Sequence, residues 1–473
     1  MLAAILDTAT WAIPGGGAAV LASRYGIGPR LLVAAIRRDR ELAVSCLQAA
    51  RIRRRWRRVA QHLGLVLVDR TKTVEAPAGT PAPKPRYVVP RMRITPDAYG
   101  VVCTARTVAG VGLTEWQKQV EHLADEWRAT RVAVTQTRPG RVRIRAVRID
   151  PLAAPTEWAP VPELLAPPRT LDRIPVGVDE YGEPVDLRLR DVAGICVCGL
   201  PGYGKTSFIN NLLTRLAPHP AVQFVGLDGK SDDPALGDYG DLADRFAILT
   251  GDDLDQANKV LTELVEFRRA RAASVRPLLG RKNAWSGDGF TPDWPLVVVI
   301  IDEAHTYFAQ VKDGGDKALK QRNALAAQNV QAVEDLVKKG RSVGILVVLA
   351  TQKGTGDAIP TQIRDVCSVS LAFACRTIEA AVAALGEDIR QYPEASPVAL
   401  RDPVYVGVAT MAVEGREGFT RVRMPYVPDE TVAAVTSLHR ALVGRRGELP
   451  RPSAVASIAP GVARDASPPD PQG

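Results

Sequence analysis

The stretch Gly199-Leu-Pro-Gly-Tyr-Gly-Lys205-Thr206 decides the fold, because a glycine-rich loop that ends in Lys-Thr is the pattern of a nucleotide phosphate-binding loop. An apolar run from Val192 to Val197 precedes it and predicts a strand, and apolar residues at helical spacing follow it from Thr206 to Leu216. A strand, a loop and a helix in this order are the context that the motif requires. The alternative is a chance match in a glycine-containing loop, and the two motifs described below count against it.

Glycines in this loop let backbone N–H groups close around an anion at the N-terminus of the following helix. We predict that the Lys205 ammonium bridges the β- and γ-phosphates of ATP and that the Thr206 hydroxyl binds Mg²⁺. The predicted ATP-binding residues are the loop and the residue after it, that is, Gly199, Leu200, Pro201, Gly202, Tyr203, Gly204, Lys205, Thr206 and Ser207. ATP and Mg²⁺ are the cofactors that these residues imply.

A second motif is an apolar strand, Leu296 to Ile301, that ends in the adjacent acids Asp302 and Glu303. We predict that Asp302 acts on Mg²⁺, directly or through its water shell, and that Glu303 is the general base that polarises the attacking water. Two adjacent acids favour hydrolysis over phosphoryl transfer to a small acceptor. The structural alternative is a strand that ends in a solvated acidic turn.

A third motif surrounds the apolar strand from Ile345 to Ala350. Gln352 leaves this strand at the end where ligands bind in parallel sheets, so we predict that it senses the γ-phosphate or places the water. Arg341 enters at the opposite end, where it is badly placed for a nucleotide in its own subunit. It is better placed to reach a neighbouring subunit's site as an arginine finger, which implies a ring. The alternative is an ordinary surface arginine.

The chain divides into parts of different composition. Residues 1–74 hold an apolar segment and an arginine-rich helical region, 75–86 a proline-rich linker, 87–170 a small α+β domain, 171–445 an α/β domain around the loop, and 446–473 a proline-rich tail predicted to be disordered. Continuous apolar strands in the α/β domain are typical of a parallel sheet that is buried on both faces. The predicted fold class is α/β, preceded by a small α+β domain and a basic N-terminal helical segment.

Positive charge is concentrated near the N-terminus. The net charge of the 473 residues is +9, and the segment from Arg30 to Arg70 holds eleven arginines against Asp39, Glu41 and Asp69. This segment is suited to phosphates or anionic lipid, and a solvated helix face is an equally good interpretation. A second basic pattern alternates along the predicted strand 141–147, where Arg141, Arg143 and Arg145 share one face. That face suits a DNA backbone, although a solvated strand face is the preferred interpretation.

The cysteines and the N-terminal segment bear on the compartment. Six cysteines are too few for a disulfide scaffold and lack paired metal-ligand spacing, so we expect a reduced, cytoplasmic protein. Residues 1–36 are apolar, but their longest uncharged run, 8–23, is short for a spanning helix, and no basic region precedes it. The basic block that follows would suit the cytoplasmic flank of an anchor. Membrane association at the inner face of the membrane therefore stays open.

With these motifs in hand, the chain resembles the FtsK/SpoIIIE motor family over residues 170–435. In addition to the phosphate loop, the segments that resemble the family include Ile174-Pro-Val-Gly-Val-Asp-Glu-Tyr-Gly-Glu-Pro-Val-Asp186, Leu227-Asp-Gly-Lys230, Lys339-Gly-Arg341, Ala350-Thr-Gln352 and Ile359-Pro-Thr-Gln-Ile-Arg364. Gly229 stands where the family has proline and Gln362 where it has arginine, and neither change removes a predicted catalytic group. The resemblance implies a RecA-like P-loop ATPase core and a homo-hexameric ring around double-stranded DNA. It also matches Arg341 to the family's arginine finger and Gln352 to its strand-end sensor.

The resemblance implies ATP hydrolysis coupled to DNA translocation. A single motor domain without an evident winged-helix module is more similar to the family's plasmid or integrative-element transfer members than to its cell-division translocases. A protein-secretion ATPase is the alternative function, because that class uses the same motor fold. A non-enzymatic DNA-binding scaffold with a vestigial nucleotide site is a third hypothesis, and the intact Lys205, Thr206, Asp302 and Glu303 argue against it.

Overall fold

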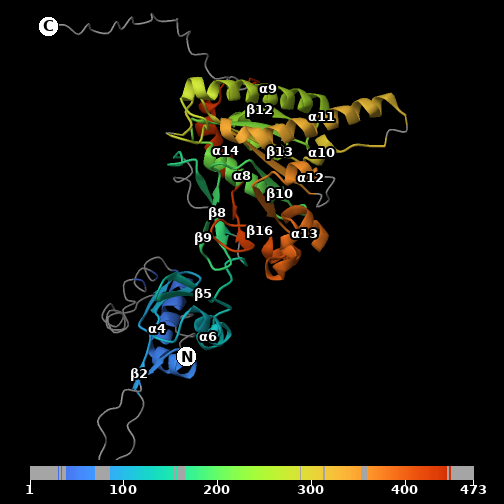
Figure 1. Cartoon of the computed structure of the whole chain (residues 1–473). Helices are drawn as coiled ribbons and strands as arrows, with labels where there is room; N and C mark the ends of the chain where they lie inside the picture. Colours follow the sequence, from blue (N-terminus) through green and yellow to red (C-terminus); the bar gives the residue numbers. More distant parts are fainter. Residues whose placement is uncertain are drawn as a thin grey trace, which may run out of the picture. The chain divides into compact units, whose positions relative to one another are not determined.

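The computed structural model describes two compact units (Figure 1). The described residues are 30, 34, 39–69, 86–153, 156–157, 166–287, 289–312, 315–352, 359–444 and 447–448. The apolar start, the linker predicted at 75–86 and the tail predicted at 446–473 therefore lie almost wholly outside them. The first unit comprises Met1–Ala154 with Val178–Glu183, and the second comprises Pro155–Gly177 with Pro184–Gly473.

The first unit is an antiparallel sheet with helices packed on it. The sheet has the strand order β3-β4-β6-β5, with bounds β3 Met92–Pro96, β4 Gly100–Arg106, β5 Arg131–Arg138 and β6 Arg141–Val147. The helices are α4 Arg40–His62, α5 Leu113–Gln117 and α6 Val120–Trp127, and a two-stranded ribbon pairs β1 Leu67–Asp69 with β2 Arg86–Val88. The arginine-rich helix α4 thus shares one unit with the small sheet.

Helix α4 is amphipathic, and its apolar face supplies much of this unit's core. Ile52, Trp56, Val59 and Ala60 recur at helical spacing and are buried. The Trp56 ring stacks on Trp116 with 5.6 Å between ring centroids, and its indole N–H donates to the Pro90 carbonyl at 2.9 Å. A buried indole needs such a partner, so this contact fixes the rotation of α4 on the sheet.

The basic face predicted for β6 is largely neutralised by acids from distant parts of the same unit. Arg145 is buried, and its guanidinium donates to both Asp97 carboxylate oxygens at 2.6 and 3.1 Å. Arg143 forms an ion pair with Glu183 at 2.6 Å. The interpretation of this face as a track for a DNA backbone is therefore not supported, because two of its three arginines are used inside the unit.

The second unit is built on a ten-stranded sheet in the order β12-β11-β13-β14-β10-β15-β16-β17-β8-β9. Its bounds are β8 Arg173–Asp179, β9 Pro184–Arg188, β10 Gly194–Cys198, β11 Val222–Asp228, β12 Phe246–Thr250, β13 Leu296–Asp302, β14 Ile345–Thr351, β15 Val369–Ala372, β16 Val408–Met411 and β17 Thr420–Arg423. The strands from β12 to β15 in this order are parallel, and β16 and β17 continue the sheet antiparallel. The predicted α/β class with a parallel sheet is confirmed.

Helices cover both faces of this sheet (Figure 1). They are α8 Lys205–Leu216, α9 Leu254–Leu279, α10 His305–Phe308, α11 Lys317–Gly340, α12 Thr361–Arg364, α13 Ile378–Leu385 and α14 Asp429–His439, and a short strand β18 Pro425–Tyr426 pairs with β7 Thr156–Glu157. Among the described residues, no helix combines the length and hydropathy that crossing a bilayer requires.

Alternate residues of the central strands enter two separate cores. In β13, Val298 and Ile300 pack with α8 and α14 on one face, whereas Val297, Val299 and Ile301 pack with α9 and α11 on the other. A strand buried on both faces must be apolar at every position, which explains the continuous apolar runs in the sequence. The sandwiched sheet holds the carboxyl ends of β10, β11, β13 and β14 in fixed positions along one edge.

Candidate nucleotide-binding site

The phosphate loop leaves the carboxyl end of β10 and enters α8 through glycines in the left-handed region. Gly199 has φ 151°, and a Cβ there would lie 2.6 Å from the Phe373 Cβ. Gly204 has φ 106°, and a Cβ there would lie 2.9 Å from the Gly407 Cα. Both positions therefore require glycine for backbone geometry and for close packing. The loop is held in place at the N-terminus of α8, where phosphate binding is favoured.

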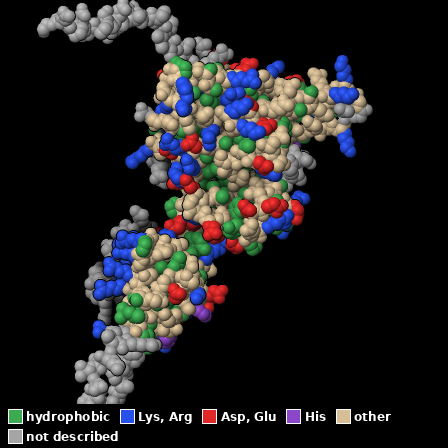
Figure 2. All heavy atoms as spheres, in the orientation of Figure 1, with side chains coloured by type: hydrophobic (Ala, Val, Ile, Leu, Met, Phe, Trp, Pro, Cys, Tyr) green, Lys and Arg blue, Asp and Glu red, His purple; other side chains and the backbone are tan. Residues whose placement is uncertain are grey.

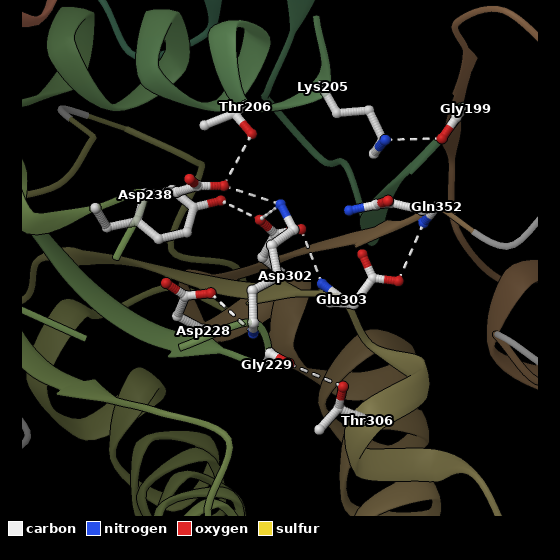
Figure 3. Close-up of polar contacts among 12 residues, drawn as sticks. Gly199, Lys205, Thr206, Asp228, Gly229, Asp238, Asp302, Glu303, Thr306 and Gln352 are labelled. Atoms are coloured by element: carbon white, nitrogen blue, oxygen red, sulfur yellow. Dashed lines mark hydrogen bonds and ion pairs between the residues drawn. The ribbon is translucent and has the colours of Figure 1, made fainter. Parts of the chain in front are cut away.

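The Lys205 side chain points toward the Gly199 carbonyl (Figure 3). Its Nζ donates to the Gly199 carbonyl at 2.7 Å and to the Leu200 carbonyl at 3.0 Å. Burial, and then the charge of Lys230, lower the pKa of Lys205 to about 8. An anion at the loop would counter both effects, so the site is electrostatically prepared for phosphate.

Asp302 is the centre of a hydrogen-bond network at the end of β13 (Figure 3). The carboxylate is only 1% exposed, and its Oδ2 accepts from Lys230 Nζ at 2.9 Å and from the Tyr239 hydroxyl at 3.0 Å. Lys230 also donates to Asp238 Oδ2 at 3.0 Å, which accepts from the Thr206 hydroxyl at 3.3 Å. Burial alone would lower the pKa of Lys230, but its two acid partners outweigh burial and raise it.

The residues predicted to bind Mg²⁺ thus belong to one network. Thr206 and Asp302 supply hard oxygen atoms next to the phosphate loop, and Asp238 and Lys230 together link them. Among the described residues, no group of three acidic, histidine or cysteine side chains forms a ready-made metal site. Magnesium needs none here, because with nucleotides it typically takes one or two protein oxygens together with phosphate and water. The donor set fits a nucleotide-bound Mg²⁺.

Glu303 follows Asp302 in a strained conformation. Its φ is 48°, its side chain is buried, and its backbone N–H donates to Asp302 Oδ1 at 2.8 Å. Its Oε1 lies 2.7 Å from His305 Nδ1 and accepts from the Gln352 backbone N–H at 3.4 Å. Its Oε2 is buried without a hydrogen-bond partner in the described part of the chain. A buried oxygen of this kind is suited to accept from a bound water.

Arg341 stands apart from these residues. It is exposed and begins the 3₁₀ turn Arg341–Val343 that leads into β14, whereas Gln352 follows the other end of that strand. Seven residues of extended chain span about 23 Å at ~3.3 Å per residue, far beyond the reach of one side chain. Arg341 therefore cannot act on the nucleotide site of its own subunit.

A cavity of about 510 Å³ opens above the loop. It is lined by residues of the phosphate loop and its surroundings and by residues between 406 and 426, namely Pro201, Gly202, Gly204, Lys205, Thr206, Ser207, Lys230, Asp238, Gln352, Val406, Gly407, Arg423, Met424, Pro425 and Tyr426. The Tyr203 side chain anchors the loop instead, because its hydroxyl donates to the Arg401 carbonyl at 2.7 Å.

Sequence reasoning did not identify Asp238, Tyr239, His305 or the wall from Val406 to Tyr426 as part of this site. Lys230 belongs to a family-like segment of the sequence, but no motif assigns it a role. Asp238 and Tyr239 belong to no recognisable motif, because they come near Asp302 only through the fold of the segment that follows β11. The one sequence signal for Asp238 is that it is an acid in the segment that follows a parallel strand.

Known proteins resemble the part of the chain that carries this site. The model of the FtsK/SpoIIIE family matches residues 168–355. DNA translocase FtsK of Leptospira interrogans is 27% identical over 212 residues, which cover 42% of this chain and 20% of the relative. DNA translocase FtsK of Staphylococcus epidermidis is 25% identical over 214 residues, covering 42% of this chain and 24% of the relative. Type VII secretion system protein EssC of Staphylococcus aureus is 22% identical over 202 residues, which cover 41% of this chain and 12% of the relative.

The chain thus spans about a fifth of the length of the curated FtsK relative from Leptospira. Among solved structures, the pCW3 conjugation coupling protein TcpA in its monomer form with ATPγS matches with a TM-score of 0.49 and 16% identity, covering 74% of this chain and 94% of that one. The match of the sequence model coincides with the strands and loops that build the site, from β8 to the end of β14. The chain therefore carries a P-loop ATPase domain, and residues 168–355 of it match the FtsK/SpoIIIE family model.

Proposed function

We propose that this protein hydrolyses ATP–Mg²⁺ and couples hydrolysis to the movement of double-stranded DNA, in conjugative transfer of a plasmid or integrative element. The observation that carries the proposal is the assembly of Lys205, Thr206, Asp302, Glu303 and Gln352 at one edge of the sheet, in a domain of this family. Relatives named DNA translocase FtsK support DNA as the cargo.

In the proposed mechanism, the loop N–H groups and Lys205 hold the phosphates at the N-terminus of α8. Thr206 and Asp302 would hold Mg²⁺, which supplies neutralisation of the phosphate charge. Glu303 accepts the proton of the attacking water, and its burial and its contact with the Gln352 backbone N–H keep its carboxylate oriented. Gln352 lines the cavity and its backbone contacts Glu303. It can therefore couple binding of the γ-phosphate to a shift of β14, the strand that Arg341 precedes.

The position of Arg341 supports a ring. This exposed arginine lies at the far end of β14 from its own nucleotide site, so a role in catalysis requires the site of a neighbouring subunit. A homo-hexamer around duplex DNA would place each Arg341 near the next subunit's γ-phosphate. An arginine supplied in trans then makes hydrolysis depend on assembly.

Duplex DNA should stimulate ATP hydrolysis several-fold. We expect this stimulation because DNA bound in a ring would order the interfaces that Arg341 completes, and we expect Lys205→Ala to abolish both basal and stimulated activity. The measurement is steady-state phosphate release with duplex DNA, single-stranded DNA or no DNA, together with oligomer size by light scattering. Stimulation by a secretion-substrate peptide but not by DNA would instead favour the protein-secretion ATPase, a class represented here by EssC.

The arginine-rich face of α4 is a second candidate for DNA contact. Arg53, Arg54, Arg55, Arg57 and Arg58 are exposed around the solvent side of the helix, whereas Trp56 is buried, and Figure 2 shows Lys and Arg side chains gathered on one side of this unit. Arg55 pairs with Glu126 at 3.5 Å, but both side chains are largely exposed, so the pair contributes little. We propose that this face contacts DNA phosphates.

Reversing these five charges to glutamate should weaken duplex DNA binding and flatten its salt dependence. The slope of log affinity against log salt is expected to fall by about 0.9 for each phosphate that the protein no longer neutralises. The measurement is a salt titration of DNA affinity by fluorescence anisotropy, with reversal of the exposed Lys259, Arg269 and Arg276 on α9 as the matched control. An unchanged slope with weakened binding to anionic vesicles would assign the face to lipid, and no change in either would make it a solvated helix face.

A further inference from the structure

An ammonium group lies in the nucleotide site where the metal ion is expected. Lys230 Nζ is 2.9 Å from Asp302 Oδ2 and 3.0 Å from Asp238 Oδ2, and Asp238 Oδ2 also accepts from the Thr206 hydroxyl. The Lys230 ammonium is therefore surrounded by the same oxygen network that contains both predicted Mg²⁺ ligands. The chain thus provides a monovalent cation that pairs with both acids.

The contacts of Asp302 make the ammonium and a divalent metal compete. Asp302 Oδ2 already accepts from Lys230 and from Tyr239, and Oδ1 accepts from the Glu303 N–H. Magnesium binds carboxylate oxygens at ~2.0–2.1 Å with strict geometry, or through waters that themselves need an acceptor. Lys230 and Tyr239 together occupy Oδ2, so a metal or its water on that oxygen would have to displace one of them. A lysine charge this close also repels a divalent ion in a buried site.

Only the side chain of Lys230 is free to leave. Its backbone N–H donates to Asp228 Oδ1 at 3.1 Å, and the neighbouring Gly229 N–H donates to the Asp302 carbonyl at 3.1 Å. The Gly229 carbonyl in turn accepts from the Thr306 hydroxyl at 3.0 Å. The main chain is thus tied to the segment that carries Asp302, whereas the Lys230 side chain is 24% exposed and lines the 510 Å³ cavity.

We propose that Lys230 holds the place of Mg²⁺ in the nucleotide-free protein and yields it only when nucleotide phosphates enter the cavity. The displaced ammonium then meets the phosphates, which replace Asp302 and Asp238 as its counter-charge. Metal without nucleotide binds weakly, because nothing would compensate the lysine charge that it displaces. This inference rests on the proposed ATP–Mg²⁺ site, and it assigns to Lys230 a positioning role that the family resemblance does not specify.

The test measures Mn²⁺ binding to the full chain without nucleotide, by electron paramagnetic resonance of the free ion. We expect weak binding by the wild type and binding tighter by roughly tenfold or more in Lys230→Met, because one positive charge next to Asp302 is removed. Lys230→Arg keeps the charge and should bind Mn²⁺ as weakly as the wild type. Adding Asp302→Asn to Lys230→Met should remove the gain, which identifies the site as this one.

Unchanged Mn²⁺ affinity in Lys230→Met would overturn the inference. Thermal unfolding is measured in parallel, because removing one partner of a buried ion pair destabilises a protein. If Lys230→Met does not fold, Lys230→Gln, which keeps a hydrogen-bond donor without the charge, carries the test. Binding of fluorescent ATPγS to the wild type is measured separately. No binding would contradict the proposed nucleotide site itself, whereas binding with unchanged Mn²⁺ affinity in Lys230→Met would contradict only the role of Lys230.

Discussion

Glu303→Gln should lower the ATP turnover number by ~10²- to 10⁴-fold, the usual contribution of a general base. Glutamine keeps the shape of the side chain, but its amide cannot take a proton from water. Nucleotide affinity should stay close to that of the wild type, because the loop, Lys205 and Thr206 are untouched. The measurements are the turnover number by phosphate release and the dissociation constant of a fluorescent ATP analogue.

The matched control is Glu266→Gln, an exposed acid on α9 outside the site, which should leave turnover unchanged. Glu303 is a well-defined target for this test, because its side chain is 6% exposed and its Oε1 accepts from the Gln352 backbone N–H at 3.4 Å. Retention of near wild-type turnover by Glu303→Gln would reject Glu303 as the base. The ATPase proposal would then need another acid of the same edge.

Arg341→Ala should lower turnover of the assembled protein by about 10³- to 10⁵-fold without weakening nucleotide binding. The separation of these two effects follows from geometry, because Arg341 and Gln352 lie at opposite ends of β14. Turnover and nucleotide affinity are measured as for Glu303, with Arg276→Ala, an exposed arginine in the last turn of α9, as the control.

Mixing variants distinguishes an arginine that acts in trans from one that merely stabilises the fold. An equimolar mixture of Arg341→Ala and Glu303→Gln contains interfaces in which an intact Glu303 faces an intact Arg341. Such a mixture should be more active than either variant alone. A mixture no more active than its components, with oligomers of normal size, would contradict the proposed role of Arg341.

The sequence was sufficient to predict the fold around the nucleotide because its signals are local. Val297 to Ile301 are apolar at every position since both faces of β13 are buried, and the strand bounds follow from that run alone. The glycine spacing likewise marks a loop whose backbone no other residue could adopt. These features depend on neighbours in sequence, so a pattern search finds them.

Features that depend on distant parts of the chain could not be predicted. The alternation of Arg143 and Arg145 indicated a basic face, but Asp97 and Glu183, which neutralise it, come from other strands and turns. In the same way, no pattern links Asp238 to Asp302, although Lys230 lies between them at hydrogen-bond distance from both. The positive charge of helix α4 could be predicted from the sequence, whereas the packing of this helix on the sheet could not.

The position of β10 in the sheet determines where this domain can be cut. β10 carries the phosphate loop and lies between β14 and β15, and the sheet continues from β15 into β16 and β17. A recombinant fragment that stopped at residue 355, where the family match ends, would leave β10 as an exposed edge and remove the cavity wall from Val406 to Tyr426. Unpaired edge strands recruit other chains and aggregate. A soluble expression unit should therefore extend at least through α14.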